Sequence, residues 1–201
     1  MPRSVDIALA AVLAAGTGCA TVSPPPPAVI MAGARSSLSY SARLRVTLEG
    51  PGLRGRTQAL VGFRRPDALR VEIPGSAGAR LVAVSREGTV TAVFPGEGAV
   101  FRGPASPEAL ESLLGVALSP PEIMDLLVGT RPTPVRTYDA KWGASLPREI
   151  TATLADGTRL KVVVEEAEAG GVLPAAAFEE PPSPGYRSIG AAEARGLWSG
   201  R

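Results

Sequence analysis

The 201-residue sequence contains no histidine and a single cysteine, Cys19. Zinc sites built from histidine and cysteine are therefore excluded, and so are catalytic pairs of the Ser-His-Asp and Cys-His kinds. The phosphate-binding motif G-x-x-x-x-G-K-[ST] and the nucleophile motif G-x-S-x-G are also missing from the sequence. These absences indicate that the protein is not an enzyme, and we expect neither a metal nor another cofactor.

Aromatic residues make up only 4% of the chain, whereas glycine (23) and proline (20) are frequent, which favours many turns and short elements. Lysine and arginine (21) nearly balance aspartate and glutamate (19), but arginines concentrate between Arg43 and Arg80. Such a basic segment could face anionic lipid headgroups or a nucleic acid. We favour the solvated outer face of a sheet, and we expect no nucleic-acid binding because no aromatic-rich motif accompanies the arginines.

The first 18 residues are typical of a secretory signal peptide. They contain a charged residue at Arg3, an apolar run from about Ile7 to Ala15 and small residues before Cys19. The run is too short to span a bilayer. The prolines Pro24–Pro27 argue against a helix that continues from this run into the folded domain.

Cys19 follows Gly16-Thr17-Gly18, which resembles a bacterial lipobox, where the cysteine becomes the acylated first residue of the mature protein. The usual pattern has leucine three residues before the cysteine, whereas this chain has Gly16. Ordinary cleavage after Ala20 is the alternative, and it would discard the cysteine. We favour acylation, because a lone cysteine in a secreted chain has no disulfide partner and two or three acyl chains anchor stably. Residues 19–35 then form a lipidated, proline-rich, extended tether.

From Leu38 onward, apolar and polar residues alternate as in strands with one buried face, for example at Leu44, Val46 and Leu48. Short turns such as Asp156-Gly157 separate these segments and make neighbouring strands antiparallel. We expect one strongly curved sheet of about nine or more strands. The other expected strands are Ala59–Phe63, Leu69–Ile73, Leu81–Ser85, Thr89–Phe94, Ala99–Arg102, Val135–Ala140, Arg148–Leu154 and Arg159–Glu165, with Leu173–Phe178 as a further candidate.

Two short helices, residues 106–115 and 119–129, interrupt the strands. Ser106 begins the first as an N-cap before Pro107, and Ser119 begins the second with Glu122 completing a capping box. Helices of about ten residues are too short to be stable alone in water, so their apolar faces must dock on the concave face of the sheet. These faces are Leu110, Leu113 and Leu114 in the first helix and Ile123, Leu126 and Leu127 in the second.

The helices and the sheet can enclose either a solid core or a ligand-sized cavity closed by a helical lid. Because aromatic residues are scarce, small and branched aliphatic side chains would have to fill a wide half-barrel. The residues by themselves support both arrangements, and only a resemblance to known proteins separates them.

Several short motifs resemble the LolA/LolB superfamily of bacterial lipoprotein carriers and receptors. They are the leader with Cys19, the segment Phe63–Arg70, the Ser119-Pro120-Pro121-Glu122 helix start, and Trp142 before Leu146-Pro147. The resemblance runs from about Leu38 to the C-terminus. It implies a divergent member with a mainly β (α+β) fold, a curved antiparallel half-barrel with a short helical lid over its concave face.

The resemblance implies an outer-membrane lipoprotein that binds acyl chains of lipoproteins or lipids in a hydrophobic cavity, without covalent chemistry. It would serve lipoprotein sorting and insertion or lipid transport at the periplasmic face of the bacterial outer membrane, with a periplasmic carrier as a partner. The alternative is a non-transporting structural subunit of an envelope assembly with the same fold. The expected cavity and lid residues are Leu44, Val46, Val61, Phe63, Leu69, Val71, Leu110, Leu114, Ile123 and Leu127.

The chain is thus expected to divide into three parts. Residues 1–18 are the signal peptide, residues 19–35 the lipidated tether and residues 36–201 the lipid-binding domain. One difference from LolB concerns a protruding loop that carries a large apolar residue in that protein. The corresponding loop here, Pro74–Gly78, contains only alanine as an apolar side chain, so a divergent lipid-binding relative is at least as well supported as a true receptor.

Overall fold

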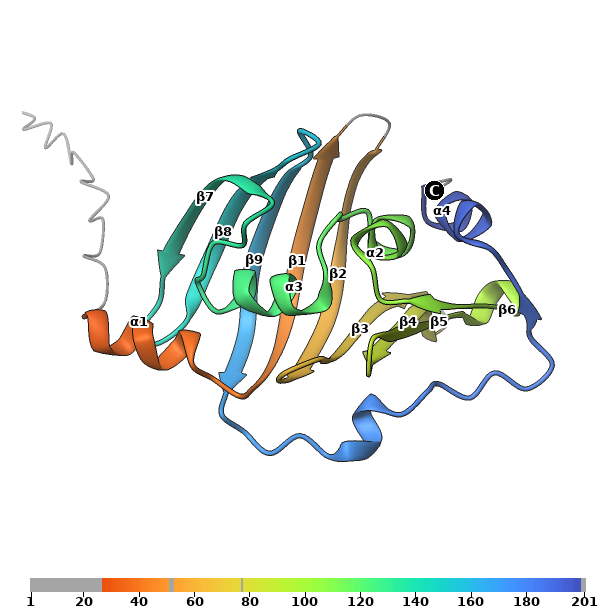
Figure 1. The fold of residues 1–201 in the computed structure, drawn as a ribbon, viewed down its shortest axis with the longest axis horizontal. Helices are drawn as coiled ribbons and strands as arrows, with labels where there is room; N and C mark the ends of the chain where they lie inside the picture. The colour runs from red at the N-terminus through yellow and green to blue at the C-terminus, as the bar shows by residue number, and fades with distance from the viewer. Residues whose placement is uncertain (1–26, 51–52, 77, 200–201) are drawn as a thin grey trace, which may run out of the picture.

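A computed structural model describes residues 27–50, 53–76 and 78–199 (Figure 1). The predicted signal peptide, Cys19 and most of the predicted tether lie outside these residues. Among the described residues, no helix is both long and apolar enough to cross a membrane.

Ten strands form one sheet in this part of the chain, in the order β10-β6-β5-β4-β3-β2-β1-β9-β8-β7. Every neighbouring pair is antiparallel except β10, which pairs in parallel with β6. The expected curved, mainly antiparallel sheet is therefore confirmed, with β10 as an unforeseen parallel addition. The strands are β1 Ser39–Gly50, β2 Leu53–Arg64, β3 Ala68–Gly75, β4 Gly78–Arg86, β5 Thr89–Phe94, β6 Ala99–Pro104, β7 Val135–Trp142, β8 Pro147–Leu154, β9 Arg159–Ala169 and β10 Arg187–Ser188.

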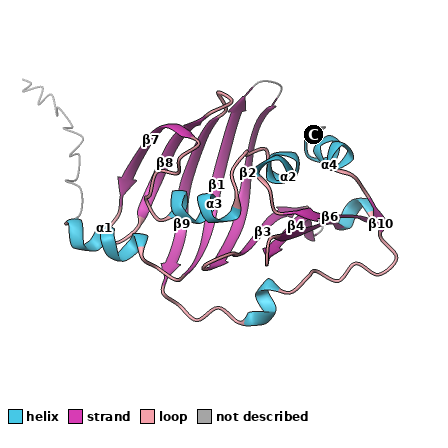
Figure 2. Cartoon of the chain, viewed as in Figure 1, coloured by secondary structure: helices cyan, strands magenta, loops and turns pink. Residues whose placement is uncertain are grey.

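The helices α2 (Pro107–Leu114) and α3 (Pro120–Leu127) lie across one face of this sheet (Figures 1 and 2). Their caps are those expected: the Ser106 hydroxyl accepts from the Ala109 amide at 3.3 Å, and Glu122 accepts from the Ser119 amide at 2.7 Å. We call α2, α3 and their connection, residues 107–127, the helical lid. Its leucine faces are buried against the sheet, as the sequence predicts.

The helix α1 (Ala28–Arg35) replaces part of the predicted tether. An extended chain was expected up to residue 35, but the last eight residues of that range are helical. Pro27 precedes the first helical residue, so the proline run ends where the helix begins and does not obstruct it. Arg35 fastens the end of α1 to the turn that follows α3, because its Nε donates to the Gly129 carbonyl at 3.1 Å.

The chain after β9 also departs from expectation. The candidate strand Leu173–Phe178 does not form, and Ala175–Phe178 is instead a 3₁₀ helix, η2. Phe178 is buried against Ala68, Val82 and Val84 on the convex face of the sheet, so packing of one ring outweighs strand formation. A second 3₁₀ helix, η1 (Pro95–Glu97), joins β5 to β6, and the last helix, α4 (Ala191–Ser199), packs beside α2.

The arginine-rich first half contributes to the convex face. Arg43 pairs with Glu166 at 3.8 Å, Arg45 with Glu165, and Arg70 with Glu72 at 3.1 Å. These pairs sit on the surface of strands whose alternate residues are buried. The interpretation as a solvated outer face is thus confirmed for these residues.

Gly129, directly after the lid, is a position where only glycine fits. Its φ is +87°, and an added Cβ would lie 2.4 Å from Cζ2 of Trp142. We expect Gly129→Ala to lower the free energy of unfolding by about 2–4 kcal/mol, through left-handed backbone strain and overpacking. Urea unfolding followed by circular dichroism measures this.

Gly33→Ala in α1 is the matched control, since no atom lies within 4 Å of its added Cβ. It should stabilise the protein by about 0.5–1 kcal/mol, because alanine is the better helix former. Equal effects of the two substitutions would contradict the account given for Gly129.

Candidate functional site: an apolar cleft beneath the helical lid

A cleft of about 90 Å³ lies between the helical lid and the concave face of the sheet. Sixteen residues line it, and all except Thr57 are aliphatic. They come from β1, β2, β3, β9 and the lid, so the cleft depends on the docking of α2 and α3. We call it the lid cleft. It has no charged lining residue, so only an apolar ligand matches its surface.

Seven of the ten residues predicted from the sequence line the lid cleft. Four belong to the sheet and three to the lid, so the structure brings strand and helix positions together around one space. They are Leu44, Val46, Val61, Val71, Leu114, Ile123 and Leu127.

The other three, Phe63, Leu69 and Leu110, are buried in the same core but do not line the cleft. Phe63 lies near the end of β2, where the Tyr40 ring stacks on it with 5.2 Å between ring centroids. The two rings fill the space there. The expectation that these three residues face the cavity is therefore not met, because alternation gives the face of a strand but not the position of a void along it.

Sequence reasoning missed nine lining residues, which are Leu48, Thr57, Ala59, Ile73, Val116, Leu118, Leu126, Leu160 and Val162. The alternation contained a signal for most of them, since Leu48 continues the Leu44–Val46 face and Ala59 shares a face with Val61. Val116 and Leu118 belong to the connection between the lid helices, where no periodicity applies.

The rim of the cleft is partly open to solvent. Val46, Thr57 and Ile123 are half-buried, whereas Leu44 and Leu126 are buried. Leu48 and Thr57 belong to the halves of β1 and β2 that approach the β1–β2 hairpin, so the cleft extends toward that end of the sheet. The lining residues at that end of the cleft are uncharged.

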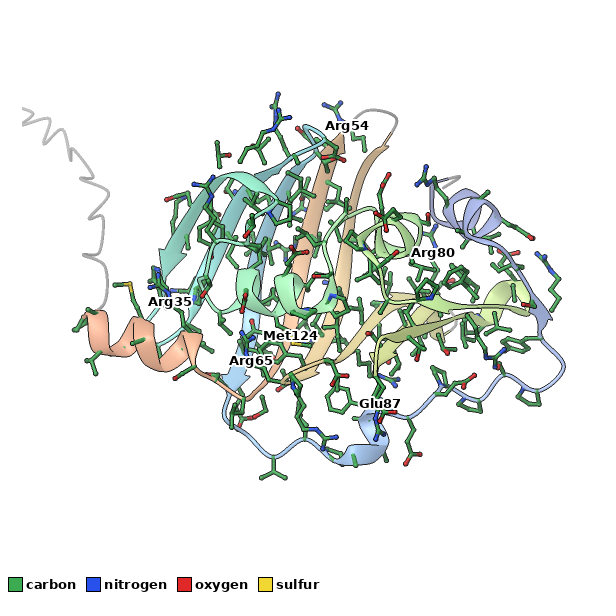
Figure 3. All side chains as sticks on the ribbon, in the orientation of Figure 1. Arg35, Arg54, Arg65, Arg80, Glu87 and Met124 are labelled. Atoms are coloured by element: carbon green, nitrogen blue, oxygen red, sulfur yellow. The ribbon has the colours of Figure 1, made fainter. Side chains whose placement is uncertain are left out.

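The two lid helices are held by different contacts. The α3 end is fastened at its surface: Arg65 pairs with Asp125 at 2.6 Å, and the Tyr138 hydroxyl donates to the Leu126 carbonyl at 3.1 Å. In Figure 3, Arg65 and Arg35 lie close to the helical segments at this end. In contrast, α2 packs along α4, with Arg195 bonded to Glu111 at 3.2 Å. Therefore α2 is covered by a second helix, whereas α3 has no comparably packed helix on it among the described residues.

A larger hollow of about 530 Å³ lies on the convex face, between the sheet and the segment that follows β9. Its lining includes Arg43, Arg70, Glu72, Glu166 and Glu168. Despite its size, this hollow does not suit an acyl chain, because the chain would strip water from charged groups. Among the described residues, no three His, Cys, Asp or Glu side chains gather as a metal-ion site would require.

Comparisons with known proteins give structural matches only. No family model and no curated protein matches the sequence. A DUF1329 family protein from Desulfovibrio piger is 12% identical, with 75% of this chain and 93% of that chain covered and a TM-score of 0.47. A LolA superfamily protein from Nitrosomonas europaea is 10% identical, with 75% and 96% covered and a TM-score of 0.46. An uncharacterized conserved protein from Thermus thermophilus is 12% identical, with 79% and 96% covered and a TM-score of 0.45.

All three structures have TM-scores below 0.5, so no family is assigned to this chain from them. The identities are low, so this likeness says nothing about what the chain binds. Any ligand must be argued from the lid cleft itself.

Two tyrosines near the lid provide a test of its packing. Tyr40 is buried, and none of the described residues hydrogen-bonds its hydroxyl. We expect Tyr40→Phe to leave the free energy of unfolding unchanged or to raise it by up to about 1 kcal/mol. Tyr138→Phe should lower it by about 1 kcal/mol, because the Leu126 carbonyl loses a donor. Urea unfolding at pH 7 compares the two.

The same variants predict a pH effect. Burial raises the pKa of both hydroxyls above the usual 10.0. Above pH 10 the unfolded tyrosines lose their protons while the folded ones keep them, so stability falls as pH rises. Tyr40→Phe should make that fall shallower than in the unmodified protein. An identical slope would show that the Tyr40 hydroxyl reaches solvent.

Proposed function

We propose that the protein is an outer-membrane lipoprotein, anchored through acylated Cys19, that binds acyl chains of lipoproteins or lipids in the lid cleft. The observation that carries this proposal is the lining: fifteen aliphatic side chains and Thr57 surround the space, under two short helices. The protein would act at the periplasmic face of the outer membrane and receive its ligand from a periplasmic carrier. The chemistry is transfer between apolar sites, so no catalytic residue is needed.

The lid must move for a whole acyl chain to enter. The cleft measures about 90 Å³, whereas pockets for drug-sized ligands measure about 300–1,000 Å³. Burying a methylene contributes about 0.8 kcal/mol, so a chain of about a dozen methylenes gains roughly 10 kcal/mol. Part of that gain offsets the burial lost by Met124, Leu126 and Leu127, and the rest acts against the few kcal/mol of the polar contacts of α3. The chain would take the place of the α3 side chains against the sheet.

Release of α3 rather than α2 follows from their contacts. The Arg65–Asp125 pair is partly exposed, with side-chain exposures of 23% and 36%, so water can replace it at little cost. In contrast, α2 is covered by α4. We therefore assign α3 as the moving part and α2 as the fixed part of the lid.

The second candidate is a structural subunit of an envelope assembly that has the same fold and transports nothing. The small volume of the cleft favours it, because most of the space beneath the lid is already filled by buried side chains. The two candidates differ in one measurable property, the uptake of an acyl chain.

Filling the cleft should abolish binding. Val46 is half-buried at the rim, so Val46→Phe places a ring in the space at small cost to the fold. We expect at least a tenfold loss of affinity for a fluorescent fatty acid, measured by titration, and loss of co-purifying lipid in native mass spectrometry. Val163→Phe is the matched control. Val163 in β9 pairs with Arg45 of β1 and Glu149 of β8 and does not line the cleft, so this variant should bind the fatty acid normally.

If the unmodified protein takes up no fatty acid and carries no lipid, the transport proposal is wrong and the structural candidate remains. If both variants bind equally well, the ligand lies elsewhere on the molecule.

Weakening the α3 contact should ease uptake. Asp125→Asn removes the ion pair with Arg65, and an exposed pair contributes about 0.5–1 kcal/mol, so the rate of fatty-acid uptake should rise about two- to fivefold. Stopped-flow fluorescence measures that rate. Glu72→Gln breaks a comparably exposed pair with Arg70 on the convex face and should leave the rate unchanged. A slower rate for Asp125→Asn would contradict the assignment of α3 as the moving part.

A further inference from the structure

Large aliphatic side chains are exposed at one edge of the described structure. Val172 is 99% exposed, Val29 76% and Leu38 71%. The fourth exposed large hydrophobic residue, Leu60, is 41% exposed and belongs to the convex-face hollow. None of the first three lines a described hollow or packs in the core. Their exposure is therefore not explained by the binding site.

Hydrogen bonds join the segments that carry two of these residues. The Ser39 hydroxyl donates to the Gly171 carbonyl at 2.7 Å, and the Gly170 amide donates to the Ser39 carbonyl at 2.9 Å. Leu38 precedes Ser39 and Val172 follows Gly171, so both lie next to these hydrogen bonds, at one end of the β1–β9 pair. Helix α1, which carries Val29, leads directly into Leu38 along the same lower edge (Figure 1). We call Val29, Leu38 and Val172 the apolar edge.

Charges of both signs surround the apolar edge: the Glu168 carboxylate lies beside Gly171, and Asp125 pairs with Arg65 at 2.6 Å. The sequence has no aspartate or glutamate between Ile7 and Leu48. Arg35 is exposed at the end of α1, and Arg65 is bonded to this edge, since its amide donates to the Leu38 carbonyl at 2.8 Å. Exposed aliphatic groups with charged groups beside them match a phospholipid surface, because the apolar groups enter the acyl region while the charged groups stay at the headgroups.

We propose that the apolar edge inserts into the surface of a phospholipid bilayer and sets the orientation of the protein on it. The strength of this insertion rests on the proposed lipid anchor at Cys19. Cys19 precedes Pro27 by eight residues, and at about 3.3–3.6 Å per residue the anchor keeps the start of α1 within about 30 Å of the membrane. An edge held so close to the bilayer binds at a high effective concentration, so three aliphatic side chains suffice.

The orientation has a consequence for the lid cleft. Leu38 immediately precedes the start of β1, whereas the cleft extends toward the β1–β2 hairpin at its other end. β1 has twelve residues, and at about 3.3 Å per residue it spans about 40 Å. With the apolar edge in the bilayer, the rim of the cleft faces away from the membrane, toward a carrier in the periplasm.

Fluorescent labelling tests this on the full chain isolated from bacterial membranes. Single cysteines are introduced as Val172→Cys and Leu38→Cys, and as the controls Leu60→Cys on the convex face and Arg54→Cys near the hairpin. Each is labelled with an environment-sensitive dye and mixed with vesicles of phosphatidylglycerol and phosphatidylethanolamine that carry brominated acyl chains. We expect several-fold stronger quenching and a blue shift at positions 172 and 38, with neither at 60 and 54.

Equal quenching at all four positions would overturn the proposal. So would a blue shift at 172 without vesicles, because another copy of the protein would then cover the edge. The mass of the purified protein reports acylation of Cys19, and fatty-acid titration of the same samples reports the lid cleft. The three measurements therefore distinguish three failures. The mass detects a missing anchor, the titration detects a cleft that binds no fatty acid, and the quenching detects an edge that stays in water. Where the anchor is missing, Cys19→Ser is combined with each variant so that only the introduced cysteine carries the dye, and added vesicles still test the edge.

Discussion

The apolar contact between the helical lid and the concave face of the sheet is the interaction on which the rest of the structure depends. Each lid helix has eight residues, too few to be stable by itself, so its helical state exists only while its leucines are docked. The sheet has the converse requirement. Its concave strands present aliphatic side chains such as Leu44 and Ile73 that must be covered. Removing the lid therefore exposes both partners, unless an acyl chain takes its place.

The sequence contained most of the fold, because two local signals coincide with the tertiary structure. Alternation marks the strands, and it is unambiguous when one face is buried, as for Leu44 and Leu48 in β1. Serine caps and C-terminal glycines mark both ends of each lid helix, for example at Ser106 and Gly115. These signals are local, and they also fix the faces: seven of the predicted lining residues meet in one cleft.

What the sequence did not contain is decided by contacts between distant segments. Whether Phe63 faces a void or a solid core depends on Tyr40, which stacks on it from the neighbouring strand. The sequence predicts a strand for the segment that contains Phe178. The segment instead forms a 3₁₀ helix, whose Phe178 ring packs against β3 and β4. The sequence does not predict α1, because a proline run favours an extended chain. Pro27, however, only precedes the first residue of the helix.

The distribution of polar contacts supports a movable lid. It is less consistent with a helix that only fills the core. A helix that serves only to fill a core needs no bonds beyond its apolar face. Yet α3 is fastened at one end by Arg65 and by Tyr138, groups that are only partly buried and can exchange their partners for water when the helix moves. The half-buried Ile123 is on the same helix, at the rim of the cleft. Polar contacts that water can replace, next to an apolar rim, allow the lid to open without leaving an unpaired buried charge, which is what exchange of an acyl chain requires.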